Sequence, residues 1–386
     1  MIKKTSYILF FIFSLNSISQ EFSLIEKYEL PTDINETSGL LFFNGKLITH
    51  NDSGDNAKLY EIDTISGSIS RTIAITNANN IDWEDISQDD THIYIADIGN
   101  NNGNRNDLKI YKILKSDYIS STNITAEVIS FSYDDQSDFT SQPNNTNFDA
   151  EAITIYQGKI LIFTKNWIDF KTNVYVVPTI VGNYSAEKVS SYDSQGLITG
   201  VSYNAGTDGF LFCGYNNTLT PFLIYVDHNR PSSLDVFGGN PTRIDLVGDI
   251  FLEQGSQIEG ITFFEDSKYY ISREFFSTNI GAVNFEFPQK LYEFYNPLDN
   301  LLSTTDDEFS KLIHIFPNPI EDHFEIIQKN NPQEIHSFSL FSLDGRTIFF
   351  KKKQDEIDFK NISKGVYLLK IKFKNDRNVV KKVIKK

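Results

Sequence analysis

The chain has 386 residues, of which 40% are hydrophobic and 14% aromatic, with a single Cys. This length points to one large domain plus a smaller one, and the apolar content excludes global disorder. One Cys excludes a disulfide framework, and a net charge of −16 argues against nucleic acid as a partner.

Residues 1–19 are predicted to be a signal peptide. Lys3 and Lys4 precede a short apolar run from Tyr7 to Leu15, and small polar residues follow. The run is too short to span a bilayer, and no later apolar stretch approaches the roughly 20 residues of a transmembrane helix. We therefore expect a protein that is exported to the periplasm and then secreted or attached to the outer-membrane surface, with no transmembrane segment.

Residues 20–300 read as a repeat of short strands. Five segments share an acid or hydroxyl residue followed by a small residue or Asp and an aliphatic residue, and each leads into two further apolar strands. A fourth strand ends each of the first four units, and residues 22–30 supply the strand that the fifth unit lacks. This pattern predicts an all-β fold, a five-bladed β-propeller. A six-bladed ring is the alternative, because residues 134–147 could contain a further irregular unit.

The repeated acid or hydroxyl position opens the innermost strand of each predicted blade, which faces the central channel. It is occupied by Ser38, Glu84, Glu151, Thr199 and Glu259. Three converging carboxylates repel one another and have raised pKa values unless a cation lies between them. Oxygen ligands in a flexible shell suit Ca²⁺ better than Mg²⁺. We therefore predict a Ca²⁺ site here, the alternative being that these residues cap strand starts or hold channel water.

The end of the second strand in each unit returns to the face where the first strand began. The polar residues predicted to gather there and bind a ligand are His50, Asn51, Asp52, Asp97, Asn100, Lys165, Tyr215 and Arg273. Loops on a rigid scaffold often carry binding residues, so an unknown extracellular ligand or small-molecule substrate is expected at this face. Turn chemistry alone is the competing explanation for its Asn and Asp residues.

The same stretches carry a resemblance. Residues 38–62, 82–84, 149–151, 199–201 and 258–263 resemble the pattern of calcium-activated nucleotidases (soluble apyrases), five-bladed propellers with one Ca²⁺ in the channel. The resemblance places that family's ligands, in the order hydroxyl, Glu, Glu, hydroxyl, Glu, on the five residues above. It implies an extracellular Ca²⁺-dependent phosphohydrolase in which Asp52 or Asp97 orients water.

The sequence departs from that family where the chemistry would occur. Asn51-Asp52-Ser53-Gly54 stands in place of paired acids before Thr-Gly, and the face has few cations for a polyphosphate. An anionic substrate would be repelled unless the metal dominates the local field. A binding protein is therefore the preferred interpretation, and the hydrolase is the alternative.

The charge changes sign toward the C-terminus. Residues 314–386 carry a net charge of +6, so the preceding residues carry −22. This asymmetry marks a boundary, with residues 301–311 as the predicted linker. Residues 312–386 contain short alternating strands and a turn at Asp344-Gly345, which predicts a small antiparallel β-sandwich.

This basic segment carries a second resemblance. Phe316-Pro317-Asn318-Pro319, residues 339–346, residues 362–369 and the lysine-rich end resemble the C-terminal sorting domain of type IX secretion substrates in Bacteroidetes. The resemblance implies that the type IX secretion machinery is a partner and that the domain is cleaved after export. A generic carbohydrate-binding or adhesive sandwich is the alternative.

Overall fold

The computed structural model describes residues 23–228, 233–246, 257–265, 267–280, 283–300, 312–328, 334–342, 347–351, 359–374 and 378–386. The predicted signal peptide, the predicted linker 301–311 and the predicted Asp344-Gly345 turn lie outside the described residues. The chain divides into two compact units, within residues 22–306 and 307–386. Among the described residues no helix is long and apolar enough to cross a membrane.

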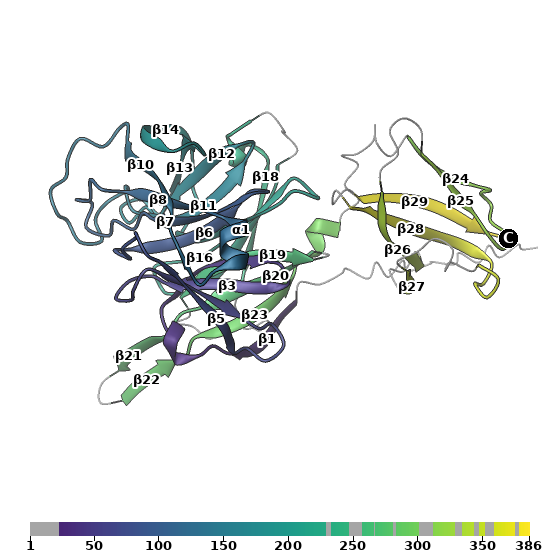
Figure 1. Cartoon of the computed structure of the whole chain (residues 1–386), viewed down its shortest axis with the longest axis horizontal. Helices are drawn as coiled ribbons and strands as arrows, with labels where there is room; N and C mark the ends of the chain where they lie inside the picture. The colour runs from purple at the N-terminus through teal and green to yellow at the C-terminus, as the bar shows by residue number, and fades with distance from the viewer. Residues whose placement is uncertain are drawn as a thin grey trace, which may run out of the picture. The chain divides into compact units, whose positions relative to one another are not determined.

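The described part of the first unit is built of strands, as the all-β prediction requires (Figure 1). Apart from one hairpin, these strands form an eight-stranded sheet, a five-stranded sheet and two four-stranded sheets. The eight-stranded sheet is described below as two groups, the second and the third, whose outer strands pair in parallel. The first group is β2 (Thr37–Phe43), β3 (Lys46–Asn51), β4 (Lys58–Ile62) and β5 (Ile69–Ile75), extended by β9 (Asn123–Ile124). The second is β6 (Trp83–Gln88), β7 (His92–Asp97), β8 (Lys109–Leu114) and β10 (Glu127–Tyr133). The third is β11 (Ala150–Tyr156), β12 (Lys159–Thr164), β13 (Thr172–Pro178) and β14 (Gly182–Tyr192).

Two further groups of strands follow along the chain. The fourth is β15 (Leu197–Asn204), β16 (Gly209–Tyr215), β17 (Pro221–Asp227) and β18 (Asn240–Asp245). The fifth is β19 (Ile258–Glu265), β20 (Lys268–Arg273), β23 (Lys290–Tyr295) and β1 (Ser23–Glu29). The predicted completion of the last group by the N-terminal strand is confirmed, since β1 pairs antiparallel with β23 (Figure 1).

Short elements fill the connections. They are the helix α1 (Lys115–Ser120), the 3-10 turns η1 (Thr32–Ile34), η2 (Val236–Gly238) and η4 (Pro297–Asn300), and a hairpin of β21 (Phe276–Ile280) and β22 (Val283–Phe287) that projects from the fifth group (Figure 1). Residues 134–147, where the six-bladed alternative requires further structure, form no strand. Instead, this segment packs on residues 100–105 through the backbone hydrogen bonds Gln142 N to Asn102 O and Asn144 N to Asn101 O.

The first strands of the five groups contact one another in a cycle. β2 contacts β6, β6 contacts β11, β11 contacts β15, β15 contacts β19, and β19 contacts β2. Five buried hydrophobic clusters follow the same cycle. Ile48 and Ile95 share one cluster between the first and second groups, and Leu40 and Leu291 share another between the first and fifth. Consecutive groups therefore bury their apolar faces against each other all the way round.

The second compact unit is also built of strands. A four-stranded sheet has the order β27 (Thr347–Lys351), β26 (Ile335–Ser342), β28 (Gly365–Phe373) and β29 (Asn378–Lys385), and β24 (Ile313–Phe316) pairs with β25 (Glu325–Gln328). Alternate residues of β28, including Tyr367, Leu369 and Ile371, are buried in one cluster with Ile313 and Phe338. This period of two is the pattern of a sheet with one buried face.

Candidate functional site

A β-bulge interrupts the first strand of every group near its start. The residue without a cross-strand partner is Gly39 in β2, Glu84 in β6, Glu151 in β11, Thr199 in β15 and Glu259 in β19. A bulge leaves one residue out of the ladder and redirects its side chain. Four of the five predicted metal ligands occupy this position, and in β2 it falls on Gly39, next to the predicted Ser38.

The two predicted hydroxyl ligands form hydrogen bonds between neighbouring first strands. The Ser38 hydroxyl donates to the carbonyl oxygen of Glu84, and Thr199 Oγ1 donates to the carbonyl oxygen of Ile258 over 2.6 Å. Both side chains are buried. These bonds connect β2 to β6 and β15 to β19, so in this structure both hydroxyls link neighbouring first strands.

The three predicted acidic ligands converge. The carboxyl groups of Glu84 and Glu151 are hydrogen-bonded to each other, and the charges of Glu151 and Glu259 interact. Burial, followed by the neighbouring acids, raises the pKa of Glu84 well above its ordinary value. Glu259 Oε2 is buried and has no hydrogen-bond partner among the described residues. An unpaired buried carboxylate oxygen is costly unless a proton or a cation satisfies it.

Further acids extend this cluster toward solvent. Asp52, Asp82 and Glu84 each bring a carboxylate oxygen within 4.8 Å of the others, and Asp52 and Asp82 are half-buried at the outer side. With these, the acidic cluster comprises Asp52, Asp82, Glu84, Asp149, Glu151, Glu259 and Glu274, and burial raises the pKa of every member. The pKa reaches about 9 for Asp52, about 8 for Asp149 and about 7 for Glu274.

Three members of the acidic cluster, Asp82, Asp149 and Glu274, were not among the predicted ligands, although a signal for two of them was present. Asp82-Trp83-Glu84 and Asp149-Ala150-Glu151 repeat an Asp-x-Glu spacing at the start of β6 and β11. Gly99 packs against the first pair so closely that a Cβ there would lie 2.1 Å from Glu84 Oε1 and 2.4 Å from Asp82 Cγ. Glu274 follows the last residue of β20 and carries no comparable repeat.

Lys165 provides a cation inside the acidic cluster. Its Nζ lies 2.8 Å from Glu151 Oε1, and it sits 5.1 Å and 5.4 Å from the ring centres of Trp167 and Tyr215. Although burial lowers the pKa of Lys165, the charges of Glu151 and its neighbours outweigh burial and raise it well above its ordinary value. One ammonium group neutralises one carboxylate, which leaves most of the cluster without a counter-charge.

The other predicted ligand-binding residues are buried and mostly occupied by protein partners. His50 Nδ1 bonds the carbonyl oxygen of Asn51 while its ring packs on Trp83, and burial lowers the pKa of His50 to about 4. Asn51 Nδ2 donates to Asp55 Oδ2 over 3.0 Å. Arg273 donates to the carbonyl oxygen of Pro288. The structure therefore places these side chains below the predicted ligand-binding face, where they bond other parts of the protein.

Asn100 and Asp97 also support loops. The Asn100 backbone N–H donates to Asp149 Oδ1 over 2.6 Å, and its side chain donates to Phe148 O. Asp97, a candidate catalytic residue, is fully buried and forms a 2.8 Å ion pair with Arg105. Burial outweighs the guanidinium and raises the pKa of Asp97 to about 6. This ion pair engages Oδ1 of the carboxylate that the prediction assigned to orienting water, while Oδ2 is buried and has no hydrogen-bond partner among the described residues. Asp52, the other candidate, belongs to the acidic cluster.

Asp85 links three of the first strands, a role that the sequence did not reveal. Its side chain is fully buried and accepts 2.8 Å hydrogen bonds from the backbone N–H groups of Ile86 and Ile153 and a further one from Val201. Asp85 thus joins β6 to β11 and β15. Burial raises its pKa well above the ordinary value despite these bonds.

The acidic cluster offers the kind of ligand atoms that a divalent cation needs. The acidic cluster offers oxygen atoms alone, its members range from buried to half-buried, and Glu259 Oε2 has no partner among the described residues. Hard cations such as Ca²⁺ prefer oxygen ligands in a flexible shell. The residues present therefore fit Ca²⁺: the carboxylate oxygens of Asp52, Asp82 and Glu84 lie within 4.8 Å of one another, and Lys165 pairs with Glu151.

A family comparison decides the nature of the C-terminal part. The model of the secretion system C-terminal sorting domain matches residues 314–386. This segment is a sorting domain. The type IX resemblance is thereby confirmed, and the domain indicates contact with a secretion machinery and export to the cell surface or beyond. No curated protein matches the chain.

Solved structures resemble the chain only distantly. A PQQ-bound aldose sugar dehydrogenase from Streptomyces coelicolor is 11% identical, with 71% of this chain and 98% of that chain covered and a TM-score of 0.38. A protein of unknown function from Bacteroides thetaiotaomicron is 8% identical, with 71% and 76% covered and a TM-score of 0.38. An exo-β-1,3-galactanase from Phanerochaete chrysosporium is 8% identical, with 94% and 93% covered and a TM-score of 0.42.

Proposed function

We propose that this protein is an exported binding protein whose larger unit is a five-bladed β-propeller with a Ca²⁺ ion in its acidic cluster, followed by a small β-sandwich for sorting. The cyclic contacts of β2, β6, β11, β15 and β19 support five blades. The shared core of β24 and the four-stranded sheet supports the sandwich. The ion joins residues from several first strands and so stabilises the ring from its axis.

One observation carries the Ca²⁺ proposal. The carboxylate oxygens of Asp52, Asp82 and Glu84 lie within 4.8 Å of one another, Lys165 pairs with Glu151, and Glu259 Oε2 has no partner within the described part of the chain. A divalent ion would ionise these groups and satisfy their oxygens. In that role Glu84, Glu259, Asp52 and Asp82 would hold the ion, while Ser38 and Thr199 could add their hydroxyl oxygens and Glu151 a further carboxylate.

We do not extend the proposal to phosphate-ester hydrolysis. The acidic cluster would repel a phosphate, and Arg105, a cation on this side of the second group, is already paired with Asp97 and Asp107. The cation that a hydrolase would need to bind an anionic substrate is thus already engaged in ion pairs within the protein.

Calcium should raise the melting temperature, and more so at high pH. Since the folded pKa values of Asp52, Asp149 and Glu274 are raised to about 9, 8 and 7, the metal-free folded state holds more protons than the unfolded state. Its stability therefore falls as pH rises from about 4 toward 9. Calcium competes with these protons. We expect about 1 mM Ca²⁺ to raise the melting temperature by roughly 5 °C or more at about pH 8, and by less at about pH 5.

Matched variants test whether the cluster is responsible. Glu84→Gln and Glu259→Gln each remove one repelling charge, so they should raise the melting temperature without metal and reduce the response to Ca²⁺. Glu127→Gln changes an exposed glutamate of β10 and should behave like the wild type. An unchanged melting temperature with Ca²⁺ at both pH values would contradict the proposal.

A further inference from the structure

The loop that follows β7 forms one wall of the acidic cluster. The backbone N–H groups of Ile98 and Gly99 both donate to the carbonyl oxygen of Asp82, over 3.1 Å and 3.2 Å. The next N–H along the loop, that of Asn100, donates to Asp149 Oδ1 over 2.6 Å. Asp82 and Asp149 immediately precede β6 and β11 and open the two Asp-x-Glu repeats. Three successive N–H groups of one loop therefore connect the starts of both repeats.

Gly99 leaves a space beside the carboxylates of the first repeat. A Cβ at this position would lie 2.1 Å from Glu84 Oε1 and 2.4 Å from Asp82 Oδ2, whereas non-bonded heavy atoms attract best at about 3.5–4.0 Å. The φ angle of Gly99 lies outside the left-handed region in which the backbone itself requires glycine. Space for the two carboxylates is therefore what glycine provides at this position.

The same two carboxylates belong to a tight group of three. Carboxylate oxygens of Asp52, Asp82 and Glu84 lie within 4.8 Å of one another. Ca²⁺ takes about six to eight oxygen ligands at about 2.3–2.6 Å, and the cation that such a site accepts depends on the size and rigidity of its ligand shell. A methyl group at residue 99 would take space that two of these carboxylates now fill, so the shell that they form around an ion has to shrink or distort.

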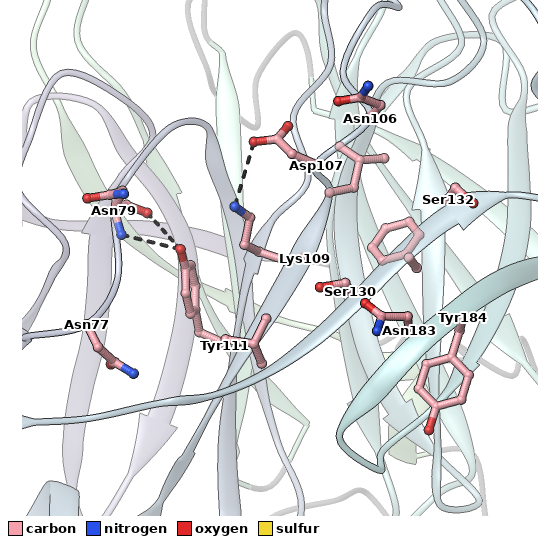
Figure 2. Close-up of a pocket in the computed structure, with 13 residues that line it drawn as sticks. Asn77, Asn79, Asn106, Asp107, Lys109, Tyr111, Ser130, Ser132, Asn183 and Tyr184 are labelled. Atoms are coloured by element: carbon pink, nitrogen blue, oxygen red, sulfur yellow. Dashed lines mark hydrogen bonds and ion pairs between the residues drawn. The ribbon is translucent and has the colours of Figure 1, made fainter.

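Arg105 fixes the position of Gly99. Its Nη1 donates to the carbonyl oxygen of Gly99 over 2.7 Å, and its Nη2 pairs with Asp97 Oδ1 at 2.8 Å. Its Nε donates to Asp107 Oδ1 over 3.0 Å. Asp107 is in turn paired with Lys109 at 3.7 Å, in a pocket of about 640 Å³ that both residues line (Figure 2). The loop cannot shift away from the acidic cluster without breaking these bonds, so a new side chain at residue 99 has to displace the carboxylates instead.

We propose that Gly99 determines the size of the cation that the acidic cluster accepts. Its bare α-carbon leaves room for the carboxylates of Asp82 and Glu84 to close around an ion as large as Ca²⁺, and Arg105 keeps the loop in place. This inference rests on the Ca²⁺ ion of the proposed function and adds the residue that selects for ion size. Glycine is needed for the site and not for the backbone conformation, so its replacement should change ion binding more than it changes the fold.

Calorimetric titrations of the purified full chain with CaCl₂ and with SrCl₂ test this inference at about pH 8, where few protons compete with the metal. Gly99→Ala should weaken Ca²⁺ binding at least about tenfold, and should weaken binding of Sr²⁺, the larger ion, by a greater factor. At Gly365 a Cβ would have its nearest neighbour at 3.5 Å, an ordinary contact, and the φ angle is again not left-handed. Gly365→Ala is therefore the matched control and should bind both ions like the wild type.

A shorter carboxylate should relieve the new contact. Glu84→Asp withdraws the carboxylate by one methylene and should by itself weaken Ca²⁺ binding. Combined with Gly99→Ala, it should cost less than the two single losses added together, because the methyl group then has room. Melting temperatures in the presence of a chelator are measured for each variant. If Gly99→Ala does not fold, the double variant decides, and it should fold and bind Ca²⁺.

The outcomes separate this inference from the Ca²⁺ proposal on which it rests. If the wild type binds neither ion, the proposed Ca²⁺ ion is wrong and this inference falls with it. If the wild type binds Ca²⁺, three results overturn the role of Gly99 alone: Gly99→Ala binds Ca²⁺ as tightly as the wild type, it loses Ca²⁺ and Sr²⁺ by the same factor, or Glu84→Asp gives no compensation.

Discussion

Asp85→Ala should destabilise the larger unit by about 3–6 kcal/mol, because the buried carboxylate accepts three backbone N–H groups from three different strands. The alanine leaves buried donors at Ile153 and Val201 without a partner and opens a cavity on the axis. Urea unfolding followed by tryptophan fluorescence gives the free energy of unfolding.

The controls for this prediction separate charge from hydrogen bonding. Asp85→Asn keeps one acceptor oxygen and should lose less stability than alanine. Asp90→Ala, at an exposed aspartate near the end of the same hairpin, should change the free energy by no more than about 0.5 kcal/mol. A loss below about 1 kcal/mol for Asp85→Ala would mean that the strands are held together without this residue.

Lys165→Met should cost about 3–5 kcal/mol at about pH 8 without metal, because it leaves the Glu151 carboxylate buried beside other acids without its cation. The cost should shrink at about pH 5, where the raised pKa values of Glu151 and its neighbours let protons replace the missing charge. Chemical unfolding at the two pH values measures both effects.

The same variant distinguishes Lys165 from a bound ion as the main counter-charge. Losing a competing cation should make Ca²⁺ bind the Lys165→Met variant more tightly than the wild type. Lys171→Met, at an exposed lysine before β13, should show neither effect. If Lys165→Met is as stable as the wild type at about pH 8, the electrostatic account of the cluster is wrong.

Much of the fold could be predicted from local pattern. Short apolar runs with turn residues between them specify β3, β7, β12, β16 and β20, which are buried along almost their whole length. The missing fourth strand of the last unit pointed to β1. The pattern did not reveal that β10 and β14 pair in parallel. That contact joins two groups through their outer strands, and its register depends on side chains far apart in the sequence.

The candidate site, like the fold, could be predicted only in part. Repeat position brought Glu84, Glu151 and Glu259 together, since a repeated strand start places equivalent residues around one axis. Repeat position did not reveal that the hydroxyls of Ser38 and Thr199 donate to carbonyl oxygens of neighbouring strands, or that Arg273 is buried and donates to the carbonyl oxygen of Pro288. Asp85 was not predicted as a functional residue because the equivalent positions of β11, β15 and β19 are occupied by Ala152, Gly200 and Gly260, which have no polar side chain.

Equilibrium dialysis of the full chain against Ca²⁺ at about 0.1 mM, with the bound metal counted by atomic spectrometry, tests the central claim most directly. The acidic cluster predicts about one Ca²⁺ per chain in the wild type and in Glu127→Gln, and a clear loss of bound metal in Glu84→Gln and Glu259→Gln. No Ca²⁺ above the level of the dialysis buffer, or the same amount in all four proteins, would contradict the proposed ion in the acidic cluster.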